Sequence, residues 1–317
     1  MQIIITGGAG FLGQKLAKAL LKNPIDFDEL LLVDVIMPAV PLQDDRIVCK
    51  QVDLSEPGVP ETLIRPDTGL IFHLAAILSS HAEKDFDLGW KINLDITKQL
   101  LEACRKRKPG IRFVFASSLA VYGGALPEMV NDMTALTPRS SYGIQKAMGE
   151  LLVNDYTRKK FVDGRVLRLP TISVRPGKPN LAASSFVSGI IREPLHGEET
   201  ICPVDPGLGL WLSSPDTTIS NFIHAASISA EQLGTWRSIN LPGLGVTVRQ
   251  MLDALEKVAG KSTVDLILFK PDPAINNIVS TWPGRIDNEP ALKLGFRSDL
   301  QFEDIITQFI NSEKNIP

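Results

Sequence analysis

The sequence predicts an α/β fold, with a doubly wound parallel sheet and a smaller C-terminal α/β lobe, and three observations support this prediction. Short β-branched runs alternate with stretches of helical period through about residue 170, as in a parallel sheet that helices cover on both faces. A glycine-rich turn joins the first apolar run to the first helical stretch. Further along, seven of the 22 prolines lie between Pro170 and Pro215, which marks a change of organisation.

The first 170 residues contain six short apolar runs with the composition of buried strands. We expect these strands at residues 3–5, 30–33, 47–52, 70–73, 111–116 and 165–169. Between them, the spacing of apolar residues predicts helices at 11–21, roughly 86–107 and 141–159. Residues 1–170 are therefore expected to form one domain around the sheet.

Residues 171–317 are expected to form the second lobe. The prolines exclude a continuous regular element between Pro170 and Pro215, so we predict loops that cap a pocket there. Helices are predicted at 216–227, at 247–259 with Thr247 as the N-cap, and near 302–311.

The first turn of the chain has the arrangement of a dinucleotide-phosphate site. Its glycines lie between a strand and a helix, where the absence of Cβ allows a tight turn and a close approach of backbone amides to a pyrophosphate. The N-terminus of the helix then faces the negative charge. We predict cofactor contacts at Gly7, Gly10, Phe11, Leu12 and Gly13.

Asp34 ends the second predicted strand, 21 residues after Gly13, where a carboxylate accepts hydrogen bonds from the ribose hydroxyls of NAD. The same carboxylate repels the 2′-phosphate of NADP, and Val35 and Ile36 offer no cation to bind one. The sequence therefore favours NAD. Asp53 has two interpretations of equal weight, a contact at the adenine end of the cofactor and a solvated turn residue.

Composition and charge exclude several classes of protein. The 317-residue chain is 44% hydrophobic and 22% charged with a net charge of −3, so it lacks the basic footprint of a nucleic-acid or anionic-membrane partner. Its three cysteines and four histidines have no ligand or disulfide spacing, so we expect no metal. The widely spaced cysteines fit a reducing cytoplasm. The N-terminus has no signal-peptide pattern and no apolar run has the length of a membrane span, so we expect no targeting to a membrane.

A tyrosine and a lysine form a candidate catalytic pair. Tyr142 and Lys146 lie one turn apart on a predicted helix, so both side chains project from the same face. The ammonium, together with a positive nicotinamide ring, would lower the pKa of the phenol and let Tyr142 act as a base, while Lys146 binds the nicotinamide ribose. Taken alone, the spacing is more often that of a surface pair.

Further stretches accompany this pair, namely His73-Leu74-Ala75-Ala76 and the run Ser117-Ser118-Leu119-Ala120-Val121-Tyr122-Gly123. With the glycine-rich turn and the Tyr–Lys pair, they resemble the extended short-chain dehydrogenase/reductase family, which implies a Rossmann fold and NAD. The resemblance also implies that Ser118, four residues before the tyrosine of Val-Tyr-Gly, is catalytic with Tyr142 and Lys146. Ser117 is the alternative serine.

The same resemblance implies further cofactor contacts. Leu74 and Ala75 would line the cofactor with their backbone, Asn93 would lie behind the active site, and Thr171 would approach the carboxamide. Asn93 is equally well interpreted as a polar group of a helix surface. His73 is interpreted as structural, because a histidine that ends a buried strand usually satisfies its ring nitrogens locally.

The second half contains Arg175-Pro176-Gly177-Lys178 and Ala182-Ala183-Ser184-Ser185-Phe186. These stretches resemble a branch of the family that oxidises C2 of D-erythronate, a four-carbon sugar acid, to the 2-oxo acid with NAD. A small sugar acid needs a cation for its carboxylate and hydroxyl partners for its chain. The predicted substrate contacts are Ser79, Ser80, Ser118, Tyr142, Arg175, Lys178 and Ser184. Solvent-facing roles are equally expected for Arg175 and Lys178.

Two other functions remain as alternatives. The first is a sugar-nucleotide epimerase or dehydratase, which would recycle its NAD. Such enzymes usually carry an aromatic-Ile-His-Val-Asp-Asp-like run, whereas residues 211–216 of this chain read Trp-Leu-Ser-Ser-Pro-Asp. This departure favours a smaller substrate. A non-catalytic dinucleotide-sensing protein would not need the serine, tyrosine and lysine together.

The two long predicted helices are expected to pair with those of a second copy in a homodimer, although the sheet alone accounts for one face of each.

Overall fold

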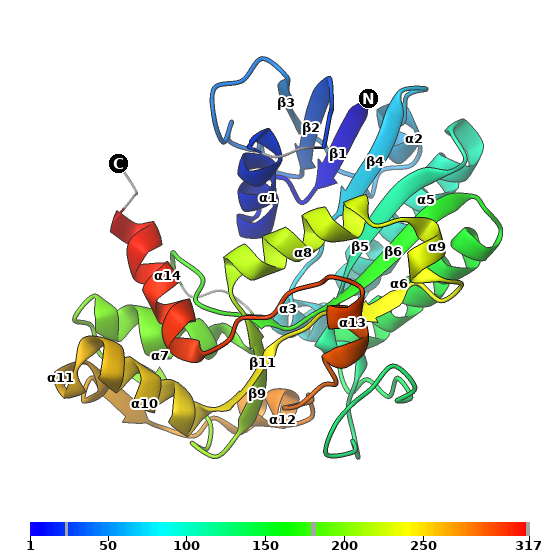
Figure 1. Ribbon diagram of the computed structural model, residues 1–317. Helices are drawn as coiled ribbons and strands as arrows, with labels where there is room; N and C mark the ends of the chain where they lie inside the picture. The colour runs from blue at the N-terminus through cyan, green and yellow to red at the C-terminus, as the bar shows by residue number, and fades with distance from the viewer. Residues whose placement is uncertain (23–24, 179–181, 315–317) are drawn as a thin grey trace.

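The computed structural model describes residues 1–22, 25–178 and 182–314. At its centre lies a sheet of seven parallel strands in the order β10-β6-β5-β4-β1-β2-β3 (Figure 1). The strands are β1 (Gln2–Thr6), β2 (Glu29–Asp34), β3 (Ile47–Gln51), β4 (Thr68–His73), β5 (Ile111–Ser118), β6 (Val162–Leu169) and β10 (Ser238–Asn240). The predicted doubly wound parallel sheet is confirmed, and each of the six predicted strands is present.

Alternation along the strands sends apolar side chains to both faces of the sheet. Ile3 and Ile5 of β1 pack in a core with α1 (Phe11–Leu21) and α8 (Pro215–Ser227), whereas Ile4 packs in a separate core on the opposite face. All three isoleucines are fully buried. This burial is expected of a parallel sheet, because helices cover both of its faces.

The opposite face is covered by α2 (Val59–Leu63), α5 (Ile96–Arg107) and α6 (Ser141–Arg158). The predicted helix 86–107 is present as a continuous run of α4 (Phe86–Gly89), a π-helical turn η1 (Trp90–Asp95) and α5. Short elements that were not predicted here include α2, α3 (Ser79–Lys84) and the single turn η2 (Leu119–Val121). Along the described residues, no helix combines the length and apolar character that crossing a membrane requires.

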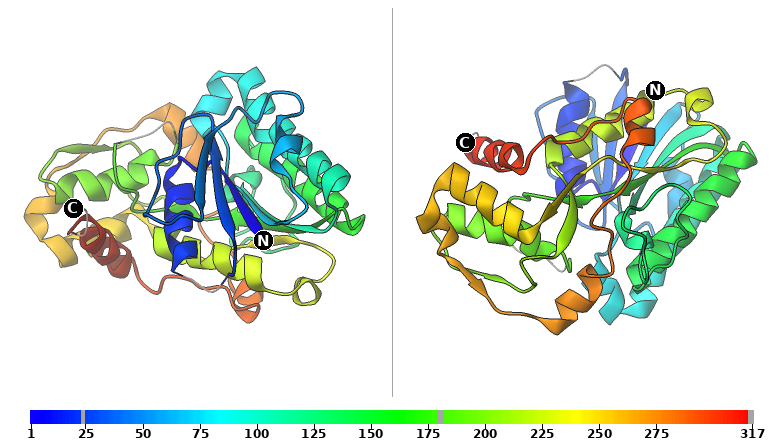
Figure 2. Two further views of the ribbon diagram at one scale, coloured as in Figure 1. Left: turned by 90° about the horizontal axis from the view of Figure 1, so that it is seen from above. Right: turned by 60° about the horizontal axis from the view of Figure 1, so that its bottom comes forward.

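The second lobe lies to one side of the sheet, with α7 and α10 packed together and α14 against α10 (Figure 2). Its helices are α7 (Ser185–Leu195), α10 (Val248–Ala259), α11 (Lys261–Val264), α12 (Pro273–Val279) and α14 (Phe302–Lys314). Two small sheets accompany them, formed by β7 (Thr171–Ile172), β9 (Gly209–Ser213) and β11 (Leu244–Thr247), and by β8 (Thr200–Cys202) and β12 (Ile267–Phe269). Two further short helices are α9 (Ala230–Leu233) and α13 (Glu289–Lys293).

One prediction for this lobe is confirmed and one is wrong. Thr247 caps α10, since its Oγ1 accepts a hydrogen bond from the backbone of Gln250 at 3.2 Å while Gln250 Oε1 accepts one from the Thr247 amide at 2.8 Å. The stretch 170–215 does not consist of loops alone, because it contains α7 and three short strands. No proline lies between Pro179 and Pro194 in the sequence, and Pro194 falls in the last turn of α7, so a helix fits between them.

The chain returns to the central sheet after entering the second lobe. Helix α8 packs against α1, and β10 pairs with β6, although both elements follow residue 170. The division into residues 1–170 and 171–317 stays a prediction, and it takes no account of this return.

Candidate functional site

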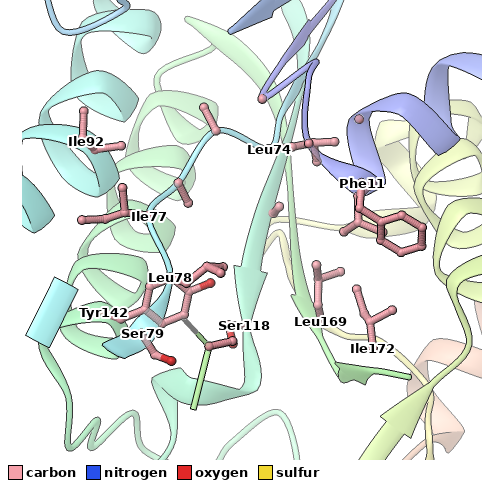
Figure 3. A pocket seen from close by; sticks show the side chains of 18 of the residues that line it. Phe11, Leu74, Ile77, Leu78, Ser79, Ile92, Ser118, Tyr142, Leu169 and Ile172 are labelled. Carbon is pink, nitrogen blue, oxygen red and sulfur yellow. The ribbon is translucent and has the colours of Figure 1, made fainter. Parts of the chain in front are cut away.

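A cavity of about 720 Å³ opens at the carboxyl ends of the central strands. It begins between β1 and β4, which are neighbours although the helices that follow them cover opposite faces, and this is where open α/β sheets bind ligands. From there it runs past the end of β5 and the first turns of α6 to α7 of the second lobe. Figure 3 shows Phe11 on one side of the cavity and Tyr142, Ser118 and Ser79 together on the other.

The glycine-rich turn leaves no room for side chains. Gly7 has a φ of +72°, and a Cβ there would lie 2.8 Å from the Ala75 nitrogen at the end of β4. A Cβ on Gly13 would lie 2.3 Å from the Gly7 oxygen, so the helix packs directly on the turn. The predicted residues that line the cavity here are Gly7, Gly10, Phe11, Leu12 and Gly13. Close backbone approach at a helix N-terminus fits the pyrophosphate of a dinucleotide.

Two acidic residues lie at the same end of the cavity. Asp34 lines it at the end of β2, and its Oδ2 accepts a hydrogen bond from the Ala9 amide at 3.0 Å. Asp53 also lines it, and its Oδ1 accepts hydrogen bonds from the hydroxyl and the amide of Ser55, which lower the pKa of the Asp53 carboxyl. Asp53 is thus a turn residue on the cavity wall, so both of its interpretations have a structural basis.

The end of β4 is held by a buried histidine. His73 Nδ1 lies 2.7 Å from Thr6 Oγ1, and its Nε2 lies 3.0 Å from Thr97 Oγ1. Burial lowers the pKa of His73 to about 3, so the ring stays neutral. The structural role predicted for His73 is confirmed, and the residues after it, Leu74 and Ala75, line the cavity.

Asn93 does not lie on the cavity wall. Its Oδ1 accepts a hydrogen bond from the Ile77 amide at 2.9 Å, and its Nδ2 donates one to Gln145 Oε1 at 2.8 Å. The residue is only 1% exposed. The helix-surface interpretation is therefore wrong, because the buried amide ties the segment after β4 to α6. The place behind the active site agrees with the resemblance, and the cofactor contact stays a prediction.

The start of α6 is fixed against the turn that follows β5. Ser140 caps the helix by accepting a hydrogen bond from the Gly143 amide at 3.2 Å. A Cβ on Gly143 would lie 2.1 Å from the Ala120 oxygen, so glycine is required for this close approach. The approach brings Tyr142 into hydrogen-bonding contact with Ser118.

Burial dominates the electrostatics of the Tyr–Lys pair. It raises the pKa of Tyr142 to about 12, against the hydrogen bond with Ser118 and the positive charge of Arg175. It lowers the pKa of Lys146 to about 7, against the negative charge of Glu150. Lys146 Nζ lies 5.7 Å from the centroid of the Tyr142 ring. The expected stabilisation of a phenolate by Lys146 is therefore outweighed in the protein alone, where the phenol is the stable form.

The two neighbouring serines meet different partners. Ser117 Oγ donates a hydrogen bond to Glu150 Oε1 at 2.5 Å, away from Tyr142, and the residue is buried. Ser118 is half-buried, caps the following turn by accepting a hydrogen bond from Ala120 at 3.1 Å, and is the serine in contact with Tyr142.

Behind the cavity, Glu150 belongs to a buried polar network. Arg168 Nη2 donates to Glu150 Oε2 at 2.7 Å, and the two side chains are 3% and 0% exposed. Arg168 Nη1 donates to the Tyr122 hydroxyl at 2.6 Å, which in turn donates to Asn240 Oδ1 at 2.8 Å. Each buried charge in this network has an opposite charge as its partner.

The far end of the cavity carries hydroxyl and cationic side chains. The predicted residues that line the cavity there are Ser79, Ser118, Tyr142, Thr171, Arg175, Lys178 and Ser184. Ser80 is not among the described lining residues. It follows Ser79 on α3, and successive residues of a helix point about 100° apart, so the two serines do not share a direction.

The lining residues that sequence reasoning missed at this end include Ser188 and Arg192 of α7 and Trp282. Ser188 and Arg192 are one helical turn apart, so they share a face of α7. This spacing would have identified them if the region between the prolines had been recognised as a helix.

The chain was compared with known proteins. The model of the NAD dependent epimerase/dehydratase family matches residues 3–210. The chain is 56% identical over 311 residues to a D-erythronate dehydrogenase of Haemophilus influenzae, which covers 98% of this chain and 99% of that protein. It is 51% identical over 318 residues to a D-erythronate dehydrogenase of Cupriavidus necator, with 98% of each covered. The crystal structure of a nucleoside-diphosphate-sugar epimerase from Agrobacterium tumefaciens has a TM-score of 0.94 and 42% identity, covering 99% of this chain and 94% of that chain.

Proposed function

The chain belongs to the NAD dependent epimerase/dehydratase family, and from this we propose that it oxidises the C2 hydroxyl of D-erythronate to the 2-oxo acid with NAD. The observation that carries this proposal is that Ser118, Tyr142, Lys146 and Arg175 line one cavity that begins at the glycine-rich turn. The choice of D-erythronate as substrate rests on the two D-erythronate dehydrogenases, each more than half identical to this chain over nearly its whole length.

When bound, NAD supplies the acceptor for the hydride that leaves C2, and its nicotinamide ring is positively charged. Tyr142 is proposed to take the proton of the C2 hydroxyl, while Ser118 holds the hydroxyl oxygen. Because burial keeps Tyr142 protonated in the protein alone, it becomes a base only when positive charge gathers around it. Lys146 and Arg175 are the protein's own sources of such charge, and both line the same cavity.

The cofactor contacts remain those expected from the sequence. Asp34 is proposed to accept hydrogen bonds from the adenosine ribose, which excludes a 2′-phosphate there. Asp53 is proposed to lie beside the adenine, and Thr171 beside the carboxamide. Leu74 and Ala75 are proposed to cover the cofactor from the end of β4.

A sugar-nucleotide epimerase is the second candidate, and the likeness to the Agrobacterium tumefaciens structure favours it. Such an enzyme would return the hydride to its substrate and release no NADH. The two candidates therefore differ in whether reduced cofactor accumulates.

An absorbance assay of NADH formation separates these candidates. The purified protein is incubated with NAD and a panel of tetronic, pentonic and hexonic acids, then with sugar nucleotides. We expect one NADH for each D-erythronate consumed, and much slower reduction when NADP replaces NAD. If D-erythronate yields no NADH while a sugar nucleotide is converted without net reduction, the epimerase is the correct assignment.

We also propose that two copies pair through α6 as a homodimer. Ile144, Met148 and Leu151 lie along one face of α6 and are 43%, 36% and 56% exposed. Such an apolar stripe on a long helix fits a second copy related by twofold symmetry. In light scattering, Leu151→Glu is expected to halve the mass. Leu300→Glu, at an 87% exposed position of a distant loop, is expected to leave it unchanged.

A cytoplasmic location is proposed from the cysteines. Cys49, Cys104 and Cys202 are free thiols, and the last two are buried. Unpaired thiols suit a reducing compartment, whereas disulfides persist in oxidising ones. Fractionation of cells would test this location.

A further inference from the structure

The position of the substrate carboxylate follows from the chemistry of a 2-hydroxy acid, so this inference rests on the proposed function. The carboxylate carbon is bonded directly to the carbon that bears the reacting hydroxyl. A cation that binds the carboxylate must therefore lie close to the Tyr142 hydroxyl. Guanidinium groups are well suited to this task because they bind carboxylates through two parallel hydrogen bonds.

Five cations line the cavity, and they differ in position. They are Lys91, Lys146, Arg175, Lys178 and Arg192. Lys91 interacts with Asp53 at the adenine end, and Lys178 is exposed. Arg192 forms an ion pair with Glu193 at 2.6 Å. Lys146 donates a hydrogen bond to the Ala116 carbonyl at 2.8 Å.

Arg175 is the remaining cation, and two properties distinguish it. Its charge interacts with the Tyr142 hydroxyl, as the influence of each group on the pKa of the other shows. No carboxylate of the described residues forms an ion pair with it, whereas the buried Arg165, Arg168 and Arg192 each have one. A largely buried guanidinium without a carboxylate partner carries a desolvation cost that a bound anion would offset.

The main chain of Arg175 is fixed from both sides by α7. Its amide donates a hydrogen bond to Ser188 Oγ at 3.0 Å. Its carbonyl accepts one from Arg192 Nη1 at 2.7 Å. Ser188 is 1% exposed and Arg192 is 5% exposed, so water does not compete for either hydrogen bond. Because these two residues are one turn apart on a rigid helix, they hold Arg175 at a constant place on the cavity wall.

We propose that Arg175 binds the substrate carboxylate and that Ser188 and Arg192 are positioning residues that hold it beside Tyr142. The arrangement makes the site selective for 2-hydroxy acids over neutral polyols of the same length. It also assigns Lys178 to the exposed rim of the cavity, without a contact to the carboxylate.

The test compares D-erythronate with its neutral amide as substrates. In Arg175→Met, kcat/KM for the acid is expected to fall about 10- to 100-fold, the effect of losing a hydrogen bond to a charged group, while kcat/KM for the amide changes little. Ser188→Ala is expected to lower the acid-to-amide ratio by a smaller factor, with kcat/KM for the amide little changed. Arg249→Met, an exposed arginine of the second lobe, is the matched control and should keep the wild-type ratio.

Calorimetric titration with NAD shows whether each variant is folded, and Arg175→Lys replaces Arg175→Met if the latter does not bind the cofactor. A wild-type ratio in the Arg175 variant overturns the inference, as does a loss that follows Lys178→Met instead. If the wild-type protein oxidises no 2-hydroxy acid, the proposed function falls, and this inference falls with it.

Discussion

Helix α6 carries two sets of polar side chains, one without an ion-pair partner among the described residues and one that forms an ion pair. At its start, Tyr142 and Lys146 face the cavity, and no carboxylate of the described residues forms an ion pair with Lys146. One turn further on, Glu150 is bound by Arg168 through three hydrogen bonds. Burial strongly shifts the pKa values of Tyr142 and Lys146. In the second set, the positive charge of Arg168 balances the negative charge of Glu150. Unpaired groups mark the place where a ligand completes the site, and paired groups hold the fold.

The largest effect is expected from Tyr142→Phe, which tests the unpaired end. We expect kcat to fall by at least about 100-fold, the scale of lost general-base catalysis, with no change in NAD affinity. Initial rates and calorimetric titration with NAD measure the two quantities. Unchanged turnover would mean that Tyr142 is not the base.

Arg168→Met tests the paired end. Removing one partner leaves the Glu150 carboxylate buried and unpaired, so we expect the free energy of unfolding in urea to fall by about 3–5 kcal/mol. Adding Glu150→Leu to this variant should restore much of the loss. Lys146→Met is the matched comparison at the unpaired end, where we expect loss of turnover without destabilisation at pH 7, because the substitution removes a desolvated charge. Equal destabilisation by both substitutions would remove the contrast.

The smallest effect concerns pH. The pKa of Lys146 is about 7 in the folded protein and 10.5 for an unperturbed lysine, so the unfolded chain binds more protons between these values. Stability therefore rises with pH across this window, by at most roughly 1.4 kcal/mol per pH unit from this group. Tyr142 acts in the opposite direction, but only above its unperturbed pKa of 10.

Urea denaturation of the wild-type protein and of Lys146→Met between about pH 7 and 9 measures this contribution, because the variant lacks it. The difference in unfolding free energy between the two proteins should increase with pH in favour of the wild type. A constant difference would show that Lys146 is not desolvated as the structure indicates.

Local patterns allowed much of the sheet and part of the site to be predicted. The run Ile3-Ile4-Ile5 is apolar at every position, as a strand buried on both faces requires, and Tyr142 and Lys146 were found because one helical turn places them together. Strand β10 was missed because Ser238-Ile239-Asn240 has a single apolar residue and its pairing with β6 is set by distant packing.

The properties that depend on enclosure could not be predicted. The pKa shifts of Tyr142 and Lys146 arise from burial by segments far away in the sequence, which spacing on one helix does not reveal. The helix-surface interpretation of Asn93 was wrong for the same reason, since its partner Gln145 lies 52 residues further along the chain. Ser188 and Arg192 were not predicted as site residues because the surrounding prolines indicated loops where α7 lies.

The path of the chain between its two lobes has a consequence for engineering. Helix α8 packs on the central sheet and strand β10 extends it, yet both are encoded between segments of the second lobe. A chimera that joins the first 170 residues to the remainder of a relative would import a foreign edge strand and a foreign helix along with the new specificity. A successful exchange would therefore transplant the lobe as several separate pieces and leave Pro215–Ser227 and Ser238–Asn240 with their native scaffold.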